Sequence, residues 1–207
     1  MARILLKDYA IPVRVECLDD PSSFDEWVKA EREQHLRLIQ AMHGGYPVPP
    51  EVIPRCYVVH GKAIPRHGFF SCVIATAVDD RFVQIIEDRE PGVHRFHPID
   101  IAMADGRPLD RPHFLLNCCT RVEALDPERS NVRKDGLRPD GSWGPFWWYH
   151  PISGLFKNLC VHKGLIEGRA MWYDIRLQKL FVSDEVFEAM RSAGLKGFRD
   201  IIRVDEA

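Results

Sequence analysis

The sequence predicts an α+β fold, in which mixed or antiparallel sheets are accompanied by a long N-terminal helix and a short C-terminal helix. Most apolar segments are short and strand-like. Only two stretches have helical periodicity, and they lie far apart instead of alternating with the strands. The 207 residues suit a single domain over 1–207, and the proline-rich segment 46–54 is the candidate subdomain boundary.

The clearest helical pattern lies in the N-terminal part of the chain. Ser23 and Glu26 have the spacing of a capping box, and apolar residues then recur at helical spacing. A pair of glycines ends the pattern. We therefore expect a helix over 24–43, followed by an extended connector at 46–54, where four prolines remove backbone donors.

Short runs of β-branched and aromatic residues predict strands through most of the remaining chain. Asp79 and Asp80 are expected to form the tight turn of a hairpin. The proline- and glycine-rich segments 89–112 and 126–155 are predicted to be irregular, apart from a short helical turn at 100–104. The segments predicted as strands are 3–6, 13–18, 55–60, 69–78, 81–87, 113–118, 121–125, 159–162, 171–174, 179–182 and 198–204.

A second, shorter helix is predicted near the C-terminus. Ser183 is suited to cap its first turn, and Asp184 and Glu185 favour the positive end of the helix dipole. Gly194 is the expected stop residue, with Leu195 as its apolar follower. The expected buried stripe of this helix consists of Val186, Phe187 and Met190.

Composition and charge limit the classes of partner. The net charge is −2 and there is no basic stripe, so we expect no nucleic-acid partner. No apolar run approaches the roughly 20 residues that a membrane span requires, so we expect no membrane partner. The six cysteines form no Cys-x-x-Cys pair and mostly lie in apolar runs, which is typical of reduced thiols in the cytoplasm.

Two residue pairs are candidates for chemistry. His94 and His97 have a spacing that two metal ligands can use, but no third ligand stands at a characteristic distance. Cys160 and His162 alternate along a predicted strand, so a thiol and an imidazole share one face. Neither pair belongs to a recognisable catalytic motif. We therefore predict a protein that is not an enzyme and has no catalytic, cofactor or metal site, with an enzyme using either pair as the alternative.

Three of the five tryptophans lie within a short aromatic stretch in the predicted loop 126–155. Trp143, Trp147 and Trp148, together with Tyr149, are the candidate partner-binding residues, because aromatic side chains dominate binding hot spots. The competing interpretation is that two of the tryptophans pin the loop onto a sheet. A stacking platform for a small ligand has less support, since no phosphate loop or basic groove accompanies it.

Two blocks in the second half resemble a known family. The first block runs from an apolar strand with Asn into a second strand and then Asp-x-x-x-Ser, and the second block combines a strand, a capped helix and Gly-Leu-x-Gly-Phe. Both are similar to the eleventh numbered family of bacterial polymorphic-toxin immunity proteins, over about 113–204. The residues that carry the resemblance are Asn117, Val122, Leu125, Asp126, Ser130, Phe181, Val182, Ser183, Gly194, Leu195, Gly197 and Phe198.

The resemblance implies a small cytoplasmic protein that binds and neutralises a cognate toxin by direct protein–protein contact. It implies no catalytic residues and no cofactor. A small-molecule-binding regulatory domain is the alternative function, and homo-oligomerisation is left open. Since fold alone does not establish function, these statements are expectations.

Overall fold

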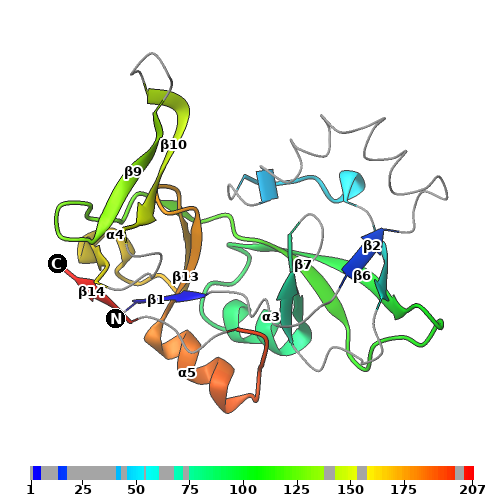
Figure 1. The fold of residues 1–207 in the computed structure, drawn as a ribbon. Helices are drawn as coiled ribbons and strands as arrows, with labels where there is room; N and C mark the ends of the chain where they lie inside the picture. Colours follow the sequence, from blue (N-terminus) through cyan, green and yellow to red (C-terminus); the bar gives the residue numbers. More distant parts are fainter. Residues whose placement is uncertain are drawn as a thin grey trace.

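The structure is a computed structural model that describes residues 2–5, 14–17, 41–42, 46–53, 55–60, 68–71, 75–137, 143–152, 158–198 and 203–207. These residues form three β-sheets, three short α-helices and one 3-10 turn (Figure 1). The strands are β1 (Ala2–Leu5), β2 (Arg14–Cys17), β3 (Cys56–His60), β4 (Phe69–Ser71), β5 (Thr76–Asp79), β6 (Arg95–Met103), β7 (His113–Asn117), β8 (Arg121–Val122), β9 (Val132–Leu137), β10 (Trp143–Pro151), β11 (Cys160–Val161), β12 (Met171–Asp174), β13 (Lys179–Ser183) and β14 (Arg203–Glu206). The helical elements are η1 (Pro50–Val52), α3 (Asp80–Glu87), α4 (Lys163–Ile166) and α5 (Asp184–Ser192).

Two six-stranded sheets make up most of this structure. The β1 sheet has the order β11-β14-β1-β13-β12-β8, and the β6 sheet has the order β2-β3-β6-β7-β5-β4. Both are mixed, because β8 runs parallel to β12, β11 to β14, and β3 to β6, while the other pairs are antiparallel. Strands β9 and β10 form a separate antiparallel pair.

The predicted α+β class with a long N-terminal helix is wrong. The described residues are mostly β-sheet, and their three α-helices are all short. Most of the helix expected at 24–43 lies outside the described residues. Within that span only residues 41 and 42 are described, and both are helical. The class was mispredicted because proline and glycine made three real strands resemble irregular chain. Within the described part, no helix combines the length and apolar character that crossing a bilayer would require.

Helix α3 replaces the strand that was predicted over 81–87. The Asp79 carboxylate accepts the backbone N–H groups of Arg81 and Phe82 and so caps the helix, instead of forming a hairpin turn. Phe82 and Ile86 are four residues apart and both are fully buried, as one helical face requires. The strand prediction rested on the β-branched residues of this segment, and capping together with burial of the apolar face overrides that preference.

Strand β6 lies within the segment 89–112, which was predicted to be irregular with a helical turn. Its side chains alternate between exposed and buried, and the buried residues His97, Ile99, Ile101 and Met103 share one face. Pro98 is tolerated because β3 begins its pairing with β6 only at Asp100, beyond the proline.

The segment 126–155 is also more regular than predicted, because it contains the β9–β10 hairpin. Trp148 is in register with Asp135, and Tyr149 with Lys134. A register shift between Trp143 and Trp148 marks an irregularity within β10. Aromatic residues favour strands, and here that preference outweighs the surrounding glycine and proline.

The helix predicted after Ser183 is present as α5. The Ser183 hydroxyl accepts the backbone N–H of Val186, and Val186, Phe187 and Met190 are fully buried. Gly194 adopts a φ of 68°, a left-handed conformation that favours glycine. Its follower, Leu195, donates its backbone N–H to the Met190 carbonyl and is buried.

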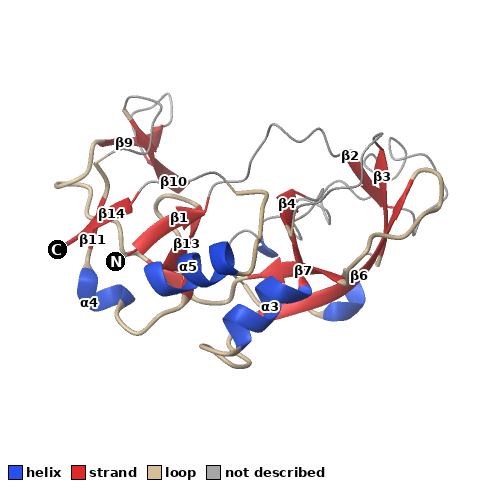
Figure 2. Ribbon diagram, turned by 90° about the horizontal axis from the view of Figure 1, so that it is seen from below, coloured by secondary structure: helices blue, strands red, loops and turns tan. Residues whose placement is uncertain are grey.

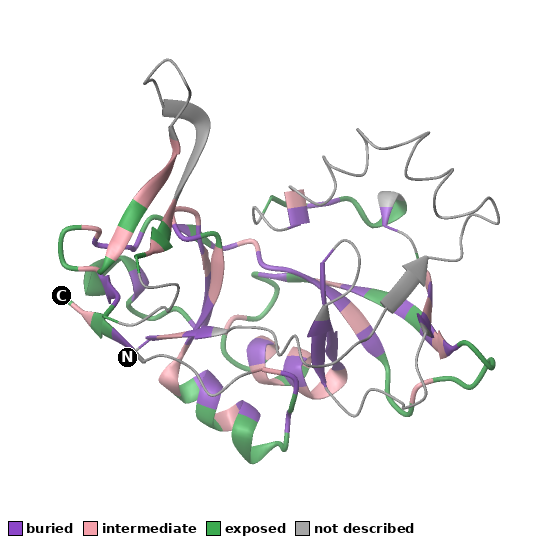
Figure 3. Ribbon diagram, viewed as in Figure 1, coloured by how far each residue is buried: buried purple, intermediate pink, exposed green. Residues whose placement is uncertain are grey.

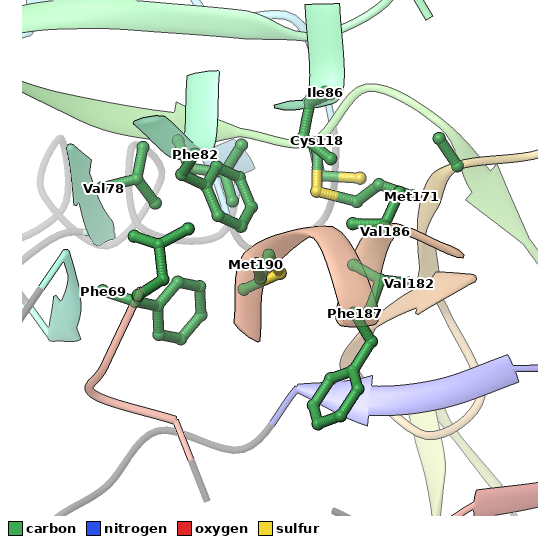
Figure 4. Packing of buried hydrophobic residues seen from close by; sticks show 13 residues of the cluster. Phe69, Val78, Phe82, Ile86, Cys118, Met171, Val182, Val186, Phe187 and Met190 are labelled. Atoms are coloured by element: carbon green, nitrogen blue, oxygen red, sulfur yellow. The ribbon is translucent and has the colours of Figure 1, made fainter. Parts of the chain in front are cut away.

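The two large sheets are joined by an apolar cluster around α3 and α5, which lie side by side (Figure 2). Phe82 and Ile86 of α3 pack in this cluster with Val186, Phe187 and Met190 of α5 (Figure 4). The packing is close: a Cβ atom at Gly68 would overlap both Leu195 and the Asp79 carboxylate. The cluster also takes in Phe69, Val78, Leu116, Cys118, Ala170, Met171, Val182 and Leu195.

A buried polar relay crosses the same joint. The Oε2 atom of Glu90 accepts a hydrogen bond from His94 Nε2 at 2.8 Å and from the Met171 backbone N–H at 3.1 Å. His94 Nδ1 accepts the backbone N–H of Cys119 at 3.3 Å. With Nδ1 as the acceptor, Nε2 carries the ring proton that Glu90 accepts. The relay therefore ties the turn after α3 to β12 and to the end of β7.

The β1 sheet contains a fully buried carboxylate, that of Asp174 at the end of β12. Its Oδ2 atom accepts the backbone N–H groups of Ala124 and Leu125, both at 2.9 Å. Its Oδ1 atom accepts those of Arg176 at 2.9 Å and Leu177 at 2.8 Å. Burial raises the pKa of Asp174, and the four N–H donors oppose that shift. One side chain thus fixes the β12–β13 turn to the chain that follows β8.

Asp174→Asn is expected to lower the free energy of unfolding by about 3 kcal/mol, because an amide NH2 group would face two buried N–H donors that have lost their acceptor. Denaturant unfolding of the purified protein measures this change. Asp205→Asn is the matched control on the exposed side of β14 and should change the free energy by no more than about 0.5 kcal/mol. Equal effects of the two substitutions would contradict the role given to Asp174.

The Glu90 carboxylate is expected to make stability depend on pH. Burial raises its pKa, but hydrogen bonds from His94 and from the backbone of Ala170 and Met171 outweigh burial and lower the pKa below 4.5. A lowered folded-state pKa stabilises the protein above the unfolded value and loses this effect as the pH falls through the folded value. The wild type should therefore lose more stability than Glu90→Gln on acidification below about pH 4.5. Parallel unfolding curves for the two proteins would contradict this prediction.

Candidate partner-binding surface

The β9–β10 hairpin projects away from the two large sheets (Figure 1). Its base is held by two backbone hydrogen bonds to other parts of the chain. Tyr149 N–H donates to the Arg176 carbonyl at 2.7 Å, and Asn131 N–H donates to the Asn158 carbonyl at 3.0 Å. Arg176 belongs to the turn that Asp174 orders, so the same buried carboxylate supports the hairpin.

The base of the hairpin has two different faces. The described residues have three apolar core clusters. Val132 and Tyr149 pack against the one that lies on the β1 sheet around Trp172 and Phe181, which we call the third core cluster. Arg133 and His150, which are in register with each other, are exposed, and so is Ile152 just after β10. Figure 3 shows such exposed segments at the base of the hairpin. Ile152 is 60% exposed. The face that points away from the core is therefore available to a partner.

The predicted partner-binding aromatics all lie on β10. The backbones of Trp143 and Trp148 are in register with Leu137 and Asp135, and the side chains of Trp143, Trp147 and Trp148 lie outside the described part of the structure. Tyr149 is half-buried against the third core cluster. The hairpin thus brings the four residues onto one strand, and their role as anchors stays a prediction.

A strip of polar and aromatic residues connects the hairpin base with the N-terminal connector. Arg176, whose carbonyl accepts from Tyr149, forms an ion pair with Glu123 at 2.9 Å. Arg121 precedes Glu123 by two residues and lies in the edge strand β8. Its guanidinium carbon is 3.8 Å from the ring centre of Tyr46. We call Tyr46, Arg121, Glu123 and Arg176 the edge strip.

Asn117 holds the Tyr46 end of the edge strip in place. Its Nδ2 atom donates to the Tyr46 carbonyl at 3.0 Å, and its Oδ1 atom accepts the Val48 backbone N–H at 3.2 Å. Asn117 is fully buried, so these bonds are shielded from water. Sequence reasoning missed Tyr46 and Arg121 as a pair, because no local pattern connects residues so far apart in the chain.

His94 and His97 are placed by the structure in separate structural roles. Both ring nitrogens of His94 are engaged, one with Glu90 and one with the Cys119 backbone. His97 lies on the buried face of β6, where burial, reinforced by the charge of Arg95, lowers its pKa. Among the described residues, no three His, Cys, Asp or Glu side chains are grouped as metal ligands.

Cys160 and His162 have environments that do not suit a nucleophile and its base. Burial raises the pKa of Cys160, whereas a nucleophilic cysteine needs a lowered pKa. The Cys160 backbone is bonded to the Ser130 hydroxyl through both its N–H (2.9 Å) and its carbonyl (3.2 Å). His162 is exposed at the start of α4.

The polar residues of the two sequence blocks likewise hold backbone. Asn117 fixes the connector, Ser130 bonds to Cys160, and Ser183 caps α5. The Asp126 carboxylate accepts the backbone N–H groups of Glu128 and Arg129 and so closes a turn. The blocks therefore specify how the chain folds, and the candidate partner-binding hairpin lies between them in the sequence.

Comparison with known proteins confirms the family that the two blocks resemble. The Immunity protein family (Imm11) matches residues 25–201, a span that begins well before the first of the two blocks and includes the hairpin. No curated protein matches the chain. Since the match extends over most of the sequence and includes both blocks, the chain belongs to the Imm11 immunity protein family.

Proposed function

We propose that the protein binds a cognate bacterial toxin in the cytoplasm and neutralises it by direct contact. The observation that carries the proposal is membership of the immunity protein family over 25–201. Immunity by binding requires a folded scaffold and a complementary surface, and it requires no catalytic residues. The partner is therefore a protein, and the site is a surface instead of a pocket for a small substrate.

The hairpin supports this proposal as part of the contact surface. Specific complexes bury about 800 Å² per partner, and a few aromatic or arginine residues carry most of the binding energy. A projecting hairpin that bears Trp143, Trp147 and Trp148 offers such residues on one element. Its base is fastened to the β1 sheet, which limits the entropy lost when a partner binds.

The contacts of the two residue pairs favour binding over catalysis. Both ring nitrogens of His94 are engaged, with Glu90 and with the Cys119 backbone, and Cys160 is a buried thiol with a raised pKa. These contacts give His94 and Cys160 structural roles, which supports a binding protein over an enzyme that uses either pair.

Co-expression with the protein encoded by the adjacent gene tests the proposal. We expect that protein to stop growth of the host when it is produced alone, and co-production of the immunity protein should restore growth. The two purified proteins should also form a stable one-to-one complex in size-exclusion chromatography. A harmless neighbour, or equal killing with and without this protein, would show that the proposed function is wrong.

Single alanine substitutions at Trp143, Trp147 and Trp148 test the aromatic anchors. At least one of the three should weaken toxin binding by about 30-fold or more while the free energy of unfolding stays unchanged. Calorimetric titration and denaturant unfolding measure the two quantities. Tyr149→Ala is the comparison, because Tyr149 packs on the third core cluster and should mainly lose stability. If all three tryptophan variants lose stability and keep their affinity when folded, the tryptophans are core residues.

A further inference from the structure

We propose that Arg121, stacked on Tyr46, is an anchor that binds a carboxylate side chain of the toxin. The proposal rests on the proposed function, since it takes the toxin as the partner. It adds a second contact region, distant in sequence from the tryptophans, and it assigns the chemistry of the group that this region binds.

The geometry leaves the hydrogen-bonding edge of Arg121 open. The Tyr46 ring covers one face of the guanidinium at 3.8 Å, and both side chains are exposed, Tyr46 by 53%. Among the described residues, none accepts a hydrogen bond from the Arg121 side chain or forms an ion pair with it. A planar fork of N–H donors therefore faces solvent while its face is held against an aromatic ring.

Both partners of the stack are held in position by backbone contacts. Asn117 binds the Tyr46 carbonyl and the Val48 N–H, which fixes the connector. Arg121 is in register with Tyr173 in the parallel pair β8–β12. These contacts fix the backbone at both residues, and the stack restrains the two side chains against each other. An arginine restrained in this way loses less entropy when a partner binds. Arginine and tyrosine are also enriched among binding hot spots.

The charges along the edge strip favour a protein carboxylate as the bound group. Glu123 lies two residues from Arg121, pairs with Arg176, and has a side chain that is 53% exposed. The strip thus alternates positive, negative and positive charges. A nucleic acid, with its uniform row of phosphates, would be repelled by Glu123. A protein surface with a carboxylate near a neutral or basic group complements this alternation, and the arginine fork matches a carboxylate in a bidentate geometry.

The edge strip is continuous with the hairpin. Tyr46 contacts Arg121, Glu123 contacts Arg176, and the Arg176 carbonyl accepts the Tyr149 N–H. A toxin that touches the base of the hairpin can therefore reach Arg121 within the same interface.

The test measures binding of the purified adjacent-gene toxin to full-length variants. Arg121→Glu should raise the Kd by about 30-fold or more, because it replaces the fork with a repelling charge. Arg121→Gln should also weaken binding, and Arg121→Lys should fall between it and the wild type, since lysine keeps the charge and loses the fork. Tyr46→Ala should weaken binding, whereas Tyr46→Phe should retain the stack and the affinity.

Arg169→Glu is the matched control for charge reversal. Arg169 is exposed and its Nε atom donates to the Leu165 carbonyl, away from the edge strip, so the Kd of this variant should stay at the wild-type value. Unfolding curves of every variant separate loss of binding from loss of fold. Reversal of one acidic residue on the toxin to arginine should restore tight binding to Arg121→Glu, a rescue that a purely structural role of Arg121 would not produce.

Three results would overturn the proposal. Wild-type affinity in both Arg121→Glu and Arg121→Gln would show that the anchor is wrong while toxin binding stands. Binding of a DNA oligonucleotide that depends on Arg121 would show that the bound group is a phosphate. Failure of the wild type itself to bind the toxin would refute the proposed function, and the anchor with it.

Discussion

The carboxylate of Asp174 is the interaction on which the arrangement of the β1 sheet and its hairpin depends. A buried anion is unfavourable unless polar groups surround it, and here four backbone N–H groups do so. These donors come from two segments just beyond the β8–β12 pair, namely the chain after β8 and the β12–β13 turn. The Arg176 carbonyl in this turn accepts the Tyr149 N–H, so the Asp174 carboxylate also helps to fix the base of the hairpin on the sheet.

Between the two large sheets, the carboxylate of Asp79 also connects a local turn to a distant part of the chain. Its carboxylate caps α3 and pairs with Arg81, which donates to the Ala193 carbonyl at the end of α5 at 2.9 Å. Burial of the apolar cluster around α3 and α5 favours packing of the two helices, and the hydrogen bonds of Asp79 and Arg81 specify which of their faces meet. Asp174 in the β1 sheet and Asp79 in the β6 sheet are thus buried carboxylates that connect a local turn to a distant segment.

The sequence allowed good prediction wherever a local rule decides the structure. Ser183 and Gly194 mark the start and end of α5 because caps depend on nearest neighbours. Prediction was wrong for α3 and β6, where packing overrode the β-branched residues of 81–87 and where the register of β3 accommodates Pro98. The Tyr46–Arg121 pair was beyond its reach, since only the complete topology brings the two residues together.

Hydrogen bonds join the chain segments that flank the hairpin on its two sides. Ser130 bonds to Cys160, and Asn131 to Asn158, so the chain enters and leaves this region at neighbouring points. A segment whose ends are joined independently of its interior can change in length and composition without disturbing the sheets below. Under the proposed function, such an architecture would let the hairpin part of the contact surface diverge while the sheets that carry it stay the same.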